Sequence, residues 1–230
     1  MKYRHEYKYF ISEKEIEIEK SKISAIMSLD THTGNSGQYT IRSLYFDNYS
    51  DRCYYENENG TDPREKFRIR IYNGSSERIT LECKRKERGK TLKTSCLITE
   101  EQCLMLMKGV VPKDIGKEQT VLSKLSILMK TELFRPKVIV EYDRIPYVYR
   151  IGNVRVTFDI NIRTSNDISH FLCSTIPARP ILQSGQHILE VKFDELLPDT
   201  VKSVLEIGML SQTAFSKYYL CRKLNYGGIL

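Results

Sequence analysis

Lys66-Phe67-Arg68-Ile69-Arg70 is the stretch that decides the fold, because cations and apolar residues alternate along it. The same alternation of charged and apolar residues recurs in 81–86, in 188–193 and near the N-terminus in 4–8. A β-strand sends successive side chains to opposite faces, so each of these segments has one charged face and one apolar or aromatic face. The sequence therefore predicts a sheet with one strongly charged face.

Two arrangements of that sheet fit the pattern. In the first, the charged face meets water and the apolar face packs on an ordinary core, as in most half-buried antiparallel strands. In the second, the strands close into a barrel with the charges inside and helices covering the apolar outside. Enclosed cations are costly unless they have acidic partners or a bound polyanion. Composition and periodicity leave both arrangements open.

Bulk composition indicates the class of protein and of partner. The chain has 230 residues, is 40% hydrophobic and carries a net charge of +7, with a pI near 9.0. This basic balance suggests an anionic partner: phosphates, nucleic acid or anionic lipid. The six cysteines form no CxxC pair, which argues against a zinc site or a disulfide framework. Free thiols, no apolar leader and no run near the ~18 residues of a membrane span predict a cytoplasmic protein, with a membrane partner on another chain left open.

Periodicity and turn residues predict one α+β domain over residues 1–230, with antiparallel strands and helices packed outside. The expected strands are 3–11, 39–46, 65–72, 77–86, 92–98, 136–149, 154–162 and 188–193. Capping boxes at Ser12–Glu15 and Thr99–Gln102 begin two helices, and 118–131, 199–210 and 216–224 read as three more. Asn73-Gly74 predicts a tight hairpin turn. Residues 164–186 read as a long polar loop, for which the sequence indicates no function.

The charged face of these strands suits phosphoryl chemistry. Its residues are Lys8, Lys66, Arg68, Arg70, Glu82, Lys84, Lys86, Arg144, Arg155, Asp159, Arg163, Glu190 and Lys192, with Lys93 and Lys217 nearby. Arginine forks and lysine ammonium groups bind phosphate oxygens, and a carboxylate among cations suits a bridging divalent metal. No Walker or Rossmann glycine loop is present in the sequence, and the four histidines lie in no catalytic motif.

Eight short motifs, in order along nearly the whole chain, resemble one family. They are RHEYKY (4–9), SLYFDN (43–48), KFRIR (66–70), LECK (81–84), RP (135–136) with YDR (142–144), RVTFD (155–159), LEVK (189–192) and FSKY (215–218). This set looks like the VTC family, the catalytic domains of the vacuolar transporter chaperone polyphosphate polymerase and their bacterial relatives. That family lies within the triphosphate tunnel metalloenzymes.

The resemblance implies a closed antiparallel β-barrel of about eight strands, whose charged residues line a tunnel open at both ends. It implies a nucleoside triphosphate and a divalent metal, Mn²⁺ or Mg²⁺, in that tunnel. Matched position by position, the implied triphosphate-binding residues are Lys8, Arg68, Arg70, Lys84, Lys93, Tyr142, Arg144, Arg155, Lys192, Ser216 and Lys217. Glu190 would hold the metal, and Arg68, Arg70, Lys84 and Glu190 would form the catalytic group. Lys66 and Lys86 are expected at the tunnel rim.

One departure from the wider superfamily bears on the reaction. The triphosphatase and adenylate cyclase branch opens with Glu-x-Glu-x-Lys, whereas the matching positions here are Arg4, Glu6 and Lys8. Loss of the first glutamate should weaken a second metal and the positioning of an attacking water, which favours transfer over hydrolysis. Glu6 could hold metal, or could pair with Arg4 or Arg70.

The expected function is therefore polyphosphate synthesis, with the γ-phosphate of a nucleoside triphosphate, ATP by expectation, passing to a growing polyphosphate chain. Two alternatives remain open: a tunnel triphosphatase that hydrolyses tripolyphosphate or nucleotides, and a non-catalytic module that binds polyphosphate. No nucleic-acid partner is expected, because neither an RNP motif nor a helix-turn-helix pattern is present in the sequence. Nucleotide preference, polymer length and oligomeric state do not follow from the sequence.

Overall fold

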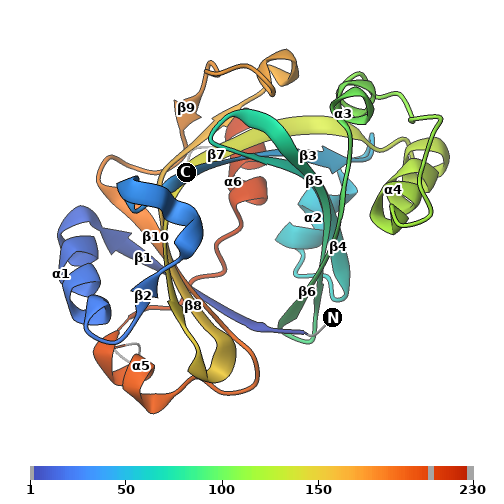
Figure 1. Cartoon of the computed structure of the whole chain (residues 1–230). Coiled ribbons are helices and arrows are strands. Elements are labelled where there is room, and N and C mark those ends of the chain that lie inside the picture. Colours follow the sequence, from blue (N-terminus) through green and yellow to red (C-terminus); the bar gives the residue numbers. More distant parts are fainter. Residues whose placement is uncertain (1–2, 207–209, 227–230) are drawn as a thin grey trace.

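A computed structural model describes residues 3–206 and 210–226, which form a curled antiparallel sheet flanked by helices (Figure 1). The strands follow in space as β1 (His5–Ser12), β10 (Gln186–Phe193), β8 (Val154–Ser165), β7 (Arg135–Tyr149), β3 (Tyr39–Asp47), β4 (Arg64–Tyr72), β5 (Ser75–Glu87) and β6 (Lys90–Leu97). The short strands β2 (Ser28–Leu29) and β9 (Arg179–Pro180) pair with β7 and β8. The expected α+β class and antiparallel sheet are confirmed.

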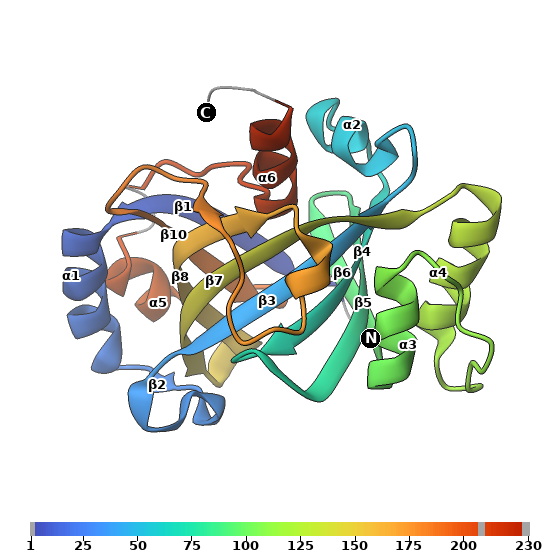
Figure 2. The same ribbon diagram turned by 90° about the horizontal axis from the view of Figure 1, so that it is seen from above.

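The helices fall into two groups around this sheet. On its outside lie α1 (Glu13–Ser24), α3 (Glu100–Met107), α4 (Thr120–Thr131) and α5 (Asp199–Val204) (Figure 1). At one end of the ring lie α2 (Arg52–Glu58) and α6 (Lys217–Asn225) (Figure 2). Three 3₁₀ turns complete the elements: η1 (Thr31–Ser36), η2 (Ile151–Asn153) and η3 (Ile168–His170). Of the helix expected over 199–210, α5 covers the first part, and residues 207–209 lie outside the described residues.

Local sequence signals account for the element boundaries. The Ser12 side chain accepts a hydrogen bond from the backbone N–H of Glu15 at the start of α1, and Thr99 does the same for Gln102 at the start of α3, so both capping boxes are confirmed. Asn73 and Gly74 adopt positive φ angles of 51° and 68° in the tight turn between β4 and β5, as the hairpin signal predicts.

The apolar face of the strands is the outer one. Phe67, Ile69 and Leu81 are fully buried in a cluster that includes Leu106 of α3 and Leu125 of α4. A second cluster on the other flank joins the apolar residues of β1, β8 and β10 to α1 and α5. Because these helices cover the apolar residues, the alternate charged residues face the concave side of the sheet. The charges therefore lie inside and the helices outside, as in the second of the two arrangements, but without its closed barrel.

The ring of strands is not closed by a continuous ladder, which corrects the expected closed barrel. The edge strands β1 and β6 meet at a single antiparallel bridge between Arg4 and Thr91, with backbone N–O distances of 2.9 Å. Further along β1, the backbone N–H of Thr213 donates to the Lys8 carbonyl, and Gln212 bridges Tyr9. The segment 212–213 therefore occupies part of the β1 edge that β6 would need for closure.

A β-bulge changes the position of Arg163, which was expected on the charged inner face. The pairing of β7 with β8 shifts between Glu141 and Asp143, and Asn161 takes a positive φ of 53°. Beyond this point the side-chain alternation of β8 is reversed. Arg163 consequently pairs with Glu141 and Asp143, on the opposite face from the Tyr142 side chain that lines the cavity.

Part of the segment 164–186 is ordered by contacts that periodicity does not reveal. The Arg42 guanidinium donates to the carbonyl oxygens of Phe171, Cys173 and Ser174, and the Phe171 side chain is fully buried. Strand β8 extends to Ser165, and η3 and β9 lie within the segment. An interior arginine thus holds part of a segment that was expected to be a long polar loop.

Replacing Gly152 by alanine should destabilise the fold. Gly152 has a φ of +71°, and an added Cβ would lie 2.9 Å from the Leu196 carbonyl oxygen and 3.2 Å from Pro198 Cδ. We expect Gly152→Ala to lower the free energy of unfolding by about 2–3 kcal/mol in urea denaturation. Gly89→Ala is the matched control, because Gly89 has a φ of +75° but no atom within 4 Å of an added Cβ. Equal effects of both changes would contradict the steric part of this account.

Candidate active site

A cavity of about 780 Å³ lies on the concave side of the sheet, where most of the predicted site residues meet. The predicted residues that line it are Lys8, Arg68, Arg70, Lys84, Tyr142, Arg144, Glu190, Lys192, Ser216 and Lys217. The helix α2 contributes Asn57 and Glu58, and residues 212–218 form another part of the wall. Segments far apart in the sequence therefore converge on one polar space.

Two arginines of β4 are held by a carboxylate of β5. Arg68 Nε donates to Glu82 Oε2 at 2.8 Å and Arg68 Nη1 donates to the Tyr45 hydroxyl at 2.8 Å, while Arg70 Nη1 lies 3.6 Å from Glu82 Oε2. Burial alone would raise the pKa of Glu82, but Arg70 and Arg68 hold that pKa well below its usual range. Glu82 is 1% exposed, so it fixes both guanidinium groups from behind.

A second buried carboxylate, Asp159 of β8, orients the cations on the other side. Arg144 Nε and Nη2 donate to the two Asp159 oxygens at 2.6 and 2.8 Å, a bidentate pair, and Lys217 Nζ donates to Asp159 Oδ2 at 2.6 Å. The Tyr142 ring lies beneath both cations, 4.7 Å from Lys217 Nζ and 5.3 Å from Arg144 Cζ. These contacts place β7 and the start of α6 around one point.

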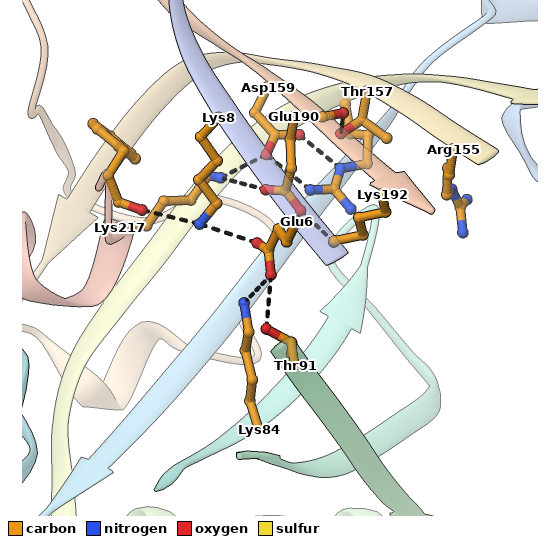
Figure 3. Close-up of polar contacts among 12 residues, drawn as sticks. Glu6, Lys8, Lys84, Thr91, Arg155, Thr157, Asp159, Glu190, Lys192 and Lys217 are labelled. Atoms are coloured by element: carbon orange, nitrogen blue, oxygen red, sulfur yellow. Dashed lines mark hydrogen bonds and ion pairs between the residues drawn. The ribbon is translucent and has the colours of Figure 1, made fainter. Parts of the chain in front are cut away.

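Two more carboxylates, Glu6 and Glu190, face the cavity from neighbouring strands (Figure 3). Glu6 lies 3.1 Å from Lys8 Nζ and 2.7 Å from Lys84 Nζ, rather than pairing with Arg4 or Arg70. Glu190 pairs with Lys192 and lies 3.8 Å from Lys217 Nζ. Burial alone would raise the pKa of each carboxyl, but the surrounding ammonium groups hold both pKa values below the usual range, so both are ionised.

The carboxylates in the cavity could bind a divalent metal only together with oxygens of a phosphate substrate or water. Within residues 3–206 and 210–226, no group of three or more His, Cys, Asp or Glu side chains is arranged to bind a metal. Mg²⁺-type sites, however, commonly use one or two carboxylates together with substrate phosphates and water. Glu190, with Glu6 beside it, supplies that number of carboxylates in the same cavity.

Positive charge exceeds negative charge in the cavity. Among the described residues, ten cations and three carboxylates line the cavity. Glu82 and Asp159 lie outside the lining, paired with Arg68 and Arg144. Burial lowers the pKa of Lys84 to about 8 and also lowers the pKa of Lys192, despite the nearby glutamates. An enclosed cluster of this kind is stabilised by a bound polyanion.

Two predicted residues, Lys93 and Arg155, do not line this cavity. Lys93 stands opposite Lys84 in the β5–β6 ladder and so shares its face, but its side chain is 51% exposed and its Nζ lies 3.1 Å from Glu82 Oε1. Arg155 pairs with Asp30 and donates to the Tyr39 hydroxyl at 3.3 Å. Figure 3 shows Arg155 to one side of the other labelled residues, with no dashed contact to them. Both expected phosphate contacts therefore lie beside lining cations, Lys84 and Lys192, but outside the cavity lining itself.

One lining residue was expected elsewhere, and one lining helix was not predicted from the sequence. Lys66 was expected at the rim but lies within the wall, near Asn57 and Ser216. The helix α2, which carries Asn57, was not predicted. Its first turn is capped by the Asp47 carboxylate, which accepts hydrogen bonds from the backbone N–H groups of Cys53 and Tyr54. Asp47 lies six residues before Cys53, which is outside the usual capping-box spacing. Alternation did place Glu82 and Asp159 on the charged face, although their positioning of arginines required the structure.

Comparison with known proteins identifies the family. The VTC domain model matches residues 3–226. The chain belongs to the VTC family. No curated protein matches it. The fold of this VTC chain resembles three solved structures. A Bacillus halodurans protein named after adenylate cyclase is 15% identical with a TM-score of 0.53, and the match covers 93% of this chain and 95% of that one. The PH1819 protein of Pyrococcus horikoshii OT3 (14% identity, TM-score 0.53) is matched over 96% of this chain and 99% of its own, and HpAC1 of Hippeastrum (14% identity, TM-score 0.54) over 100% and 98%.

HpAC1 carries the name of an adenylyl cyclase and is described as having a dominant triphosphatase activity. At these identities, the likeness of the VTC chain to the three structures concerns the fold. No helix within the described part of the VTC chain is long and apolar enough to cross a membrane.

Proposed function

We propose that this chain is a polyphosphate polymerase, which transfers the γ-phosphate of a nucleoside triphosphate, ATP by expectation, to the end of a polyphosphate chain. The observation that carries the proposal is the cavity in which oriented arginines and lysines surround Glu6 and Glu190. Membership of the VTC family supports it. Two polyanions must approach each other in this reaction, and the excess of cations offsets their repulsion.

The side chains have separable roles in this proposal. Arg68, Arg70 and Arg144 grip phosphate oxygens and are already fixed by Glu82 and Asp159, so little reorganisation is needed when charge spreads over the transferring group. Lys8, Lys84, Lys192 and Lys217 add point charges, and the Tyr142 and Ser216 hydroxyls add neutral contacts. A divalent cation, Mn²⁺ or Mg²⁺, held by Glu190 with Glu6 beside it, would neutralise charge on bridging phosphate oxygens.

The bond changes require no protein nucleophile. An oxygen of the terminal phosphate of the acceptor chain attacks the γ-phosphorus in line with the bond to the nucleoside diphosphate. The new P–O bond forms as that bond breaks, so one nucleoside diphosphate leaves for each phosphate added. The protein positions the two reactants and stabilises the charge on the group in transfer.

The first motif position supports transfer over hydrolysis. Arg4 stands where the triphosphatase branch has a glutamate, and its Nε lies 3.1 Å from Asp194 Oδ1, outside the cavity lining. A carboxylate that could orient an attacking water is therefore replaced by a cation engaged elsewhere. The second candidate is a triphosphatase, favoured by the fold shared with HpAC1.

The test is to incubate the purified protein with ATP, Mn²⁺ and a short polyphosphate primer and to follow chain length on a gel. We expect a ladder of longer chains, and we expect Arg68→Ala to slow its formation by about 10²–10³-fold. Arg78→Ala is the control, because Arg78 lies exposed on the same sheet. Orthophosphate without longer chains would indicate the triphosphatase. Tight primer binding without either product would indicate a binding module.

A further inference from the structure

Lys66 differs from the other buried or half-buried lysines of the cavity wall in having no acidic partner among the described residues. Lys8 and Lys84 pair with Glu6, Lys192 pairs with Glu190, and Lys217 pairs with Asp159. Lys66 also lines the cavity and is half-buried, yet none of the described carboxylates lies within 4 Å of its ammonium group. Among the described residues, two further lining cations have no carboxylate partner: Lys86, which is exposed, and Arg64, which donates to the Thr61 carbonyl at the start of β4.

The contacts of Lys66 are neutral and come from three elements. Its Nζ donates to Asn57 Oδ1 of α2 at 2.6 Å and to the hydroxyl of Ser216, the N-cap of α6, at 3.1 Å. It also lies 5.2 Å from the centroid of the Tyr218 ring. Asn57 and Ser216 both line the cavity, so these contacts hold the ammonium group at the end of the cavity that α2 and the start of α6 bound.

The charged and titratable groups that face Lys66 do not neutralise the positive charge of its ammonium group. Arg64, Lys84 and Lys8 add positive charge nearby, while the Cys53 thiol and the half-buried Glu56, which pairs with Arg52, lie on α2. Burial, reinforced by these cations, lowers the pKa of Lys66 to about 7. An enclosed cation that protein groups leave uncompensated indicates that its counter-ion is a ligand.

We propose that Lys66 and Asn57, together with Ser216 of the triphosphate-binding set, form a further phosphate subsite at the end of the cavity bounded by α2 and the start of α6, and that Lys66 takes up a proton when a phosphate group binds. The ligand class, an inorganic oligophosphate, rests on the proposed function. Asn57 and Ser216 hold the ammonium group in place, and both can also donate hydrogen bonds to phosphate oxygens. The subsite extends the phosphate-binding surface beyond the arginines of β4 and β7.

The sign of the proton coupling follows from the charges. In the free protein at pH 8, Lys66 is mostly neutral, whereas a phosphate group beside it favours the protonated form. Binding at pH 8 therefore takes up a proton at this site, and binding at pH 6 does not. Affinity should fall as the pH rises above about 7, because protonating Lys66 then costs part of the binding free energy.

Calorimetric titration with tripolyphosphate tests the subsite without any turnover. Titrations in pairs of buffers that differ in ionisation enthalpy give the number of protons taken up, at pH 6 and at pH 8. We expect Lys66→Arg to bind within about threefold of the wild type at pH 6 while taking up close to one proton fewer at pH 8. Lys66→Met should bind about tenfold more weakly or worse at pH 6.

Lys108→Met is the control, because Lys108 is an exposed residue beyond α3; it should leave affinity and proton uptake unchanged. Thermal unfolding verifies that each variant is folded. Wild-type proton uptake by Lys66→Arg at pH 8 would overturn the proposal, as would wild-type affinity of Lys66→Met at pH 6. Absence of polymer synthesis would bear on the proposed function alone, because this experiment measures binding.

Discussion

Replacing Glu190 by glutamine should reduce phosphoryl transfer by about 10³-fold and remove its dependence on the divalent metal. Glu190 is 3% exposed and ionised, and glutamine has the same shape but lacks the charge that would hold the cation. Tripolyphosphate should still bind, since the cations that grip it remain. Transfer rates at several Mn²⁺ concentrations, measured as nucleoside diphosphate release, check this result.

Glu58→Gln is the matched control for Glu190→Gln. Glu58 of α2 lines the same cavity but is exposed to solvent. Its carboxylate accepts a hydrogen bond from the Tyr219 hydroxyl at 3.2 Å. We expect this variant to keep transfer within a few-fold of the wild type. A Glu190→Gln protein that retains metal-dependent transfer would rule out Glu190 as the metal ligand.

Replacing Glu82 by glutamine should give the largest loss of stability among the site variants. The change leaves Arg68 and Arg70 without the buried carboxylate between them, and breaking a buried ion pair from one side costs about 3–5 kcal/mol. At this chain length, we expect the thermal midpoint near neutral pH to fall by roughly 6–20 °C. Differential scanning calorimetry measures the shift directly.

The pH dependence of the stability lost in Glu82→Gln tests whether the ionised carboxylate is its source. Arg70 and Arg68 hold the pKa of Glu82 well below its usual range, although burial alone would raise it. The stabilisation from Glu82 is therefore fully present above about pH 4.3, the unfolded value, and is lost only as the pH falls through the lower folded value. The gap between wild type and Glu82→Gln should persist at pH 5 and narrow in stronger acid.

Glu87→Gln is the control on the same strand. Glu87 forms a partly exposed pair with Arg85, and surface pairs of this kind contribute about 0–1 kcal/mol. Its midpoint should fall by no more than about 4 °C. A Glu82→Gln midpoint equal to that of Glu87→Gln would mean that the arginines are held by other contacts.

Alternation in single strands was sufficient to predict which residues share a face. In 66–70 and 81–86 it identified the cations and Glu82 as one set, and the apolar residues between them do pack under α3 and α4. Local signals also succeeded, as at the capping box of Ser12 and the turn at Asn73-Gly74. These features depend on interactions within a few residues, which a sequence displays directly.

Features that depend on distant segments could not be predicted in this way. The position of Arg163 depends on a bulge at Asn161, and one extra residue in a strand reverses every side chain beyond it. The incomplete ring depends on residues 212–213 occupying the β1 edge. Lys66 faces Asn57 and Ser216 only because α2 and α6 meet at one end of the ring.

The central claim is that the cavity passes phosphate to a chain rather than to water, and the ratio of two products tests it most directly. Nucleoside diphosphate released and phosphate incorporated into acid-insoluble polymer are measured in the same reaction with ATP, Mn²⁺ and primer. We expect a ratio close to one, with both products falling together in Glu190→Gln. Nucleoside diphosphate accompanied by an equal amount of orthophosphate, with none in polymer, would contradict it.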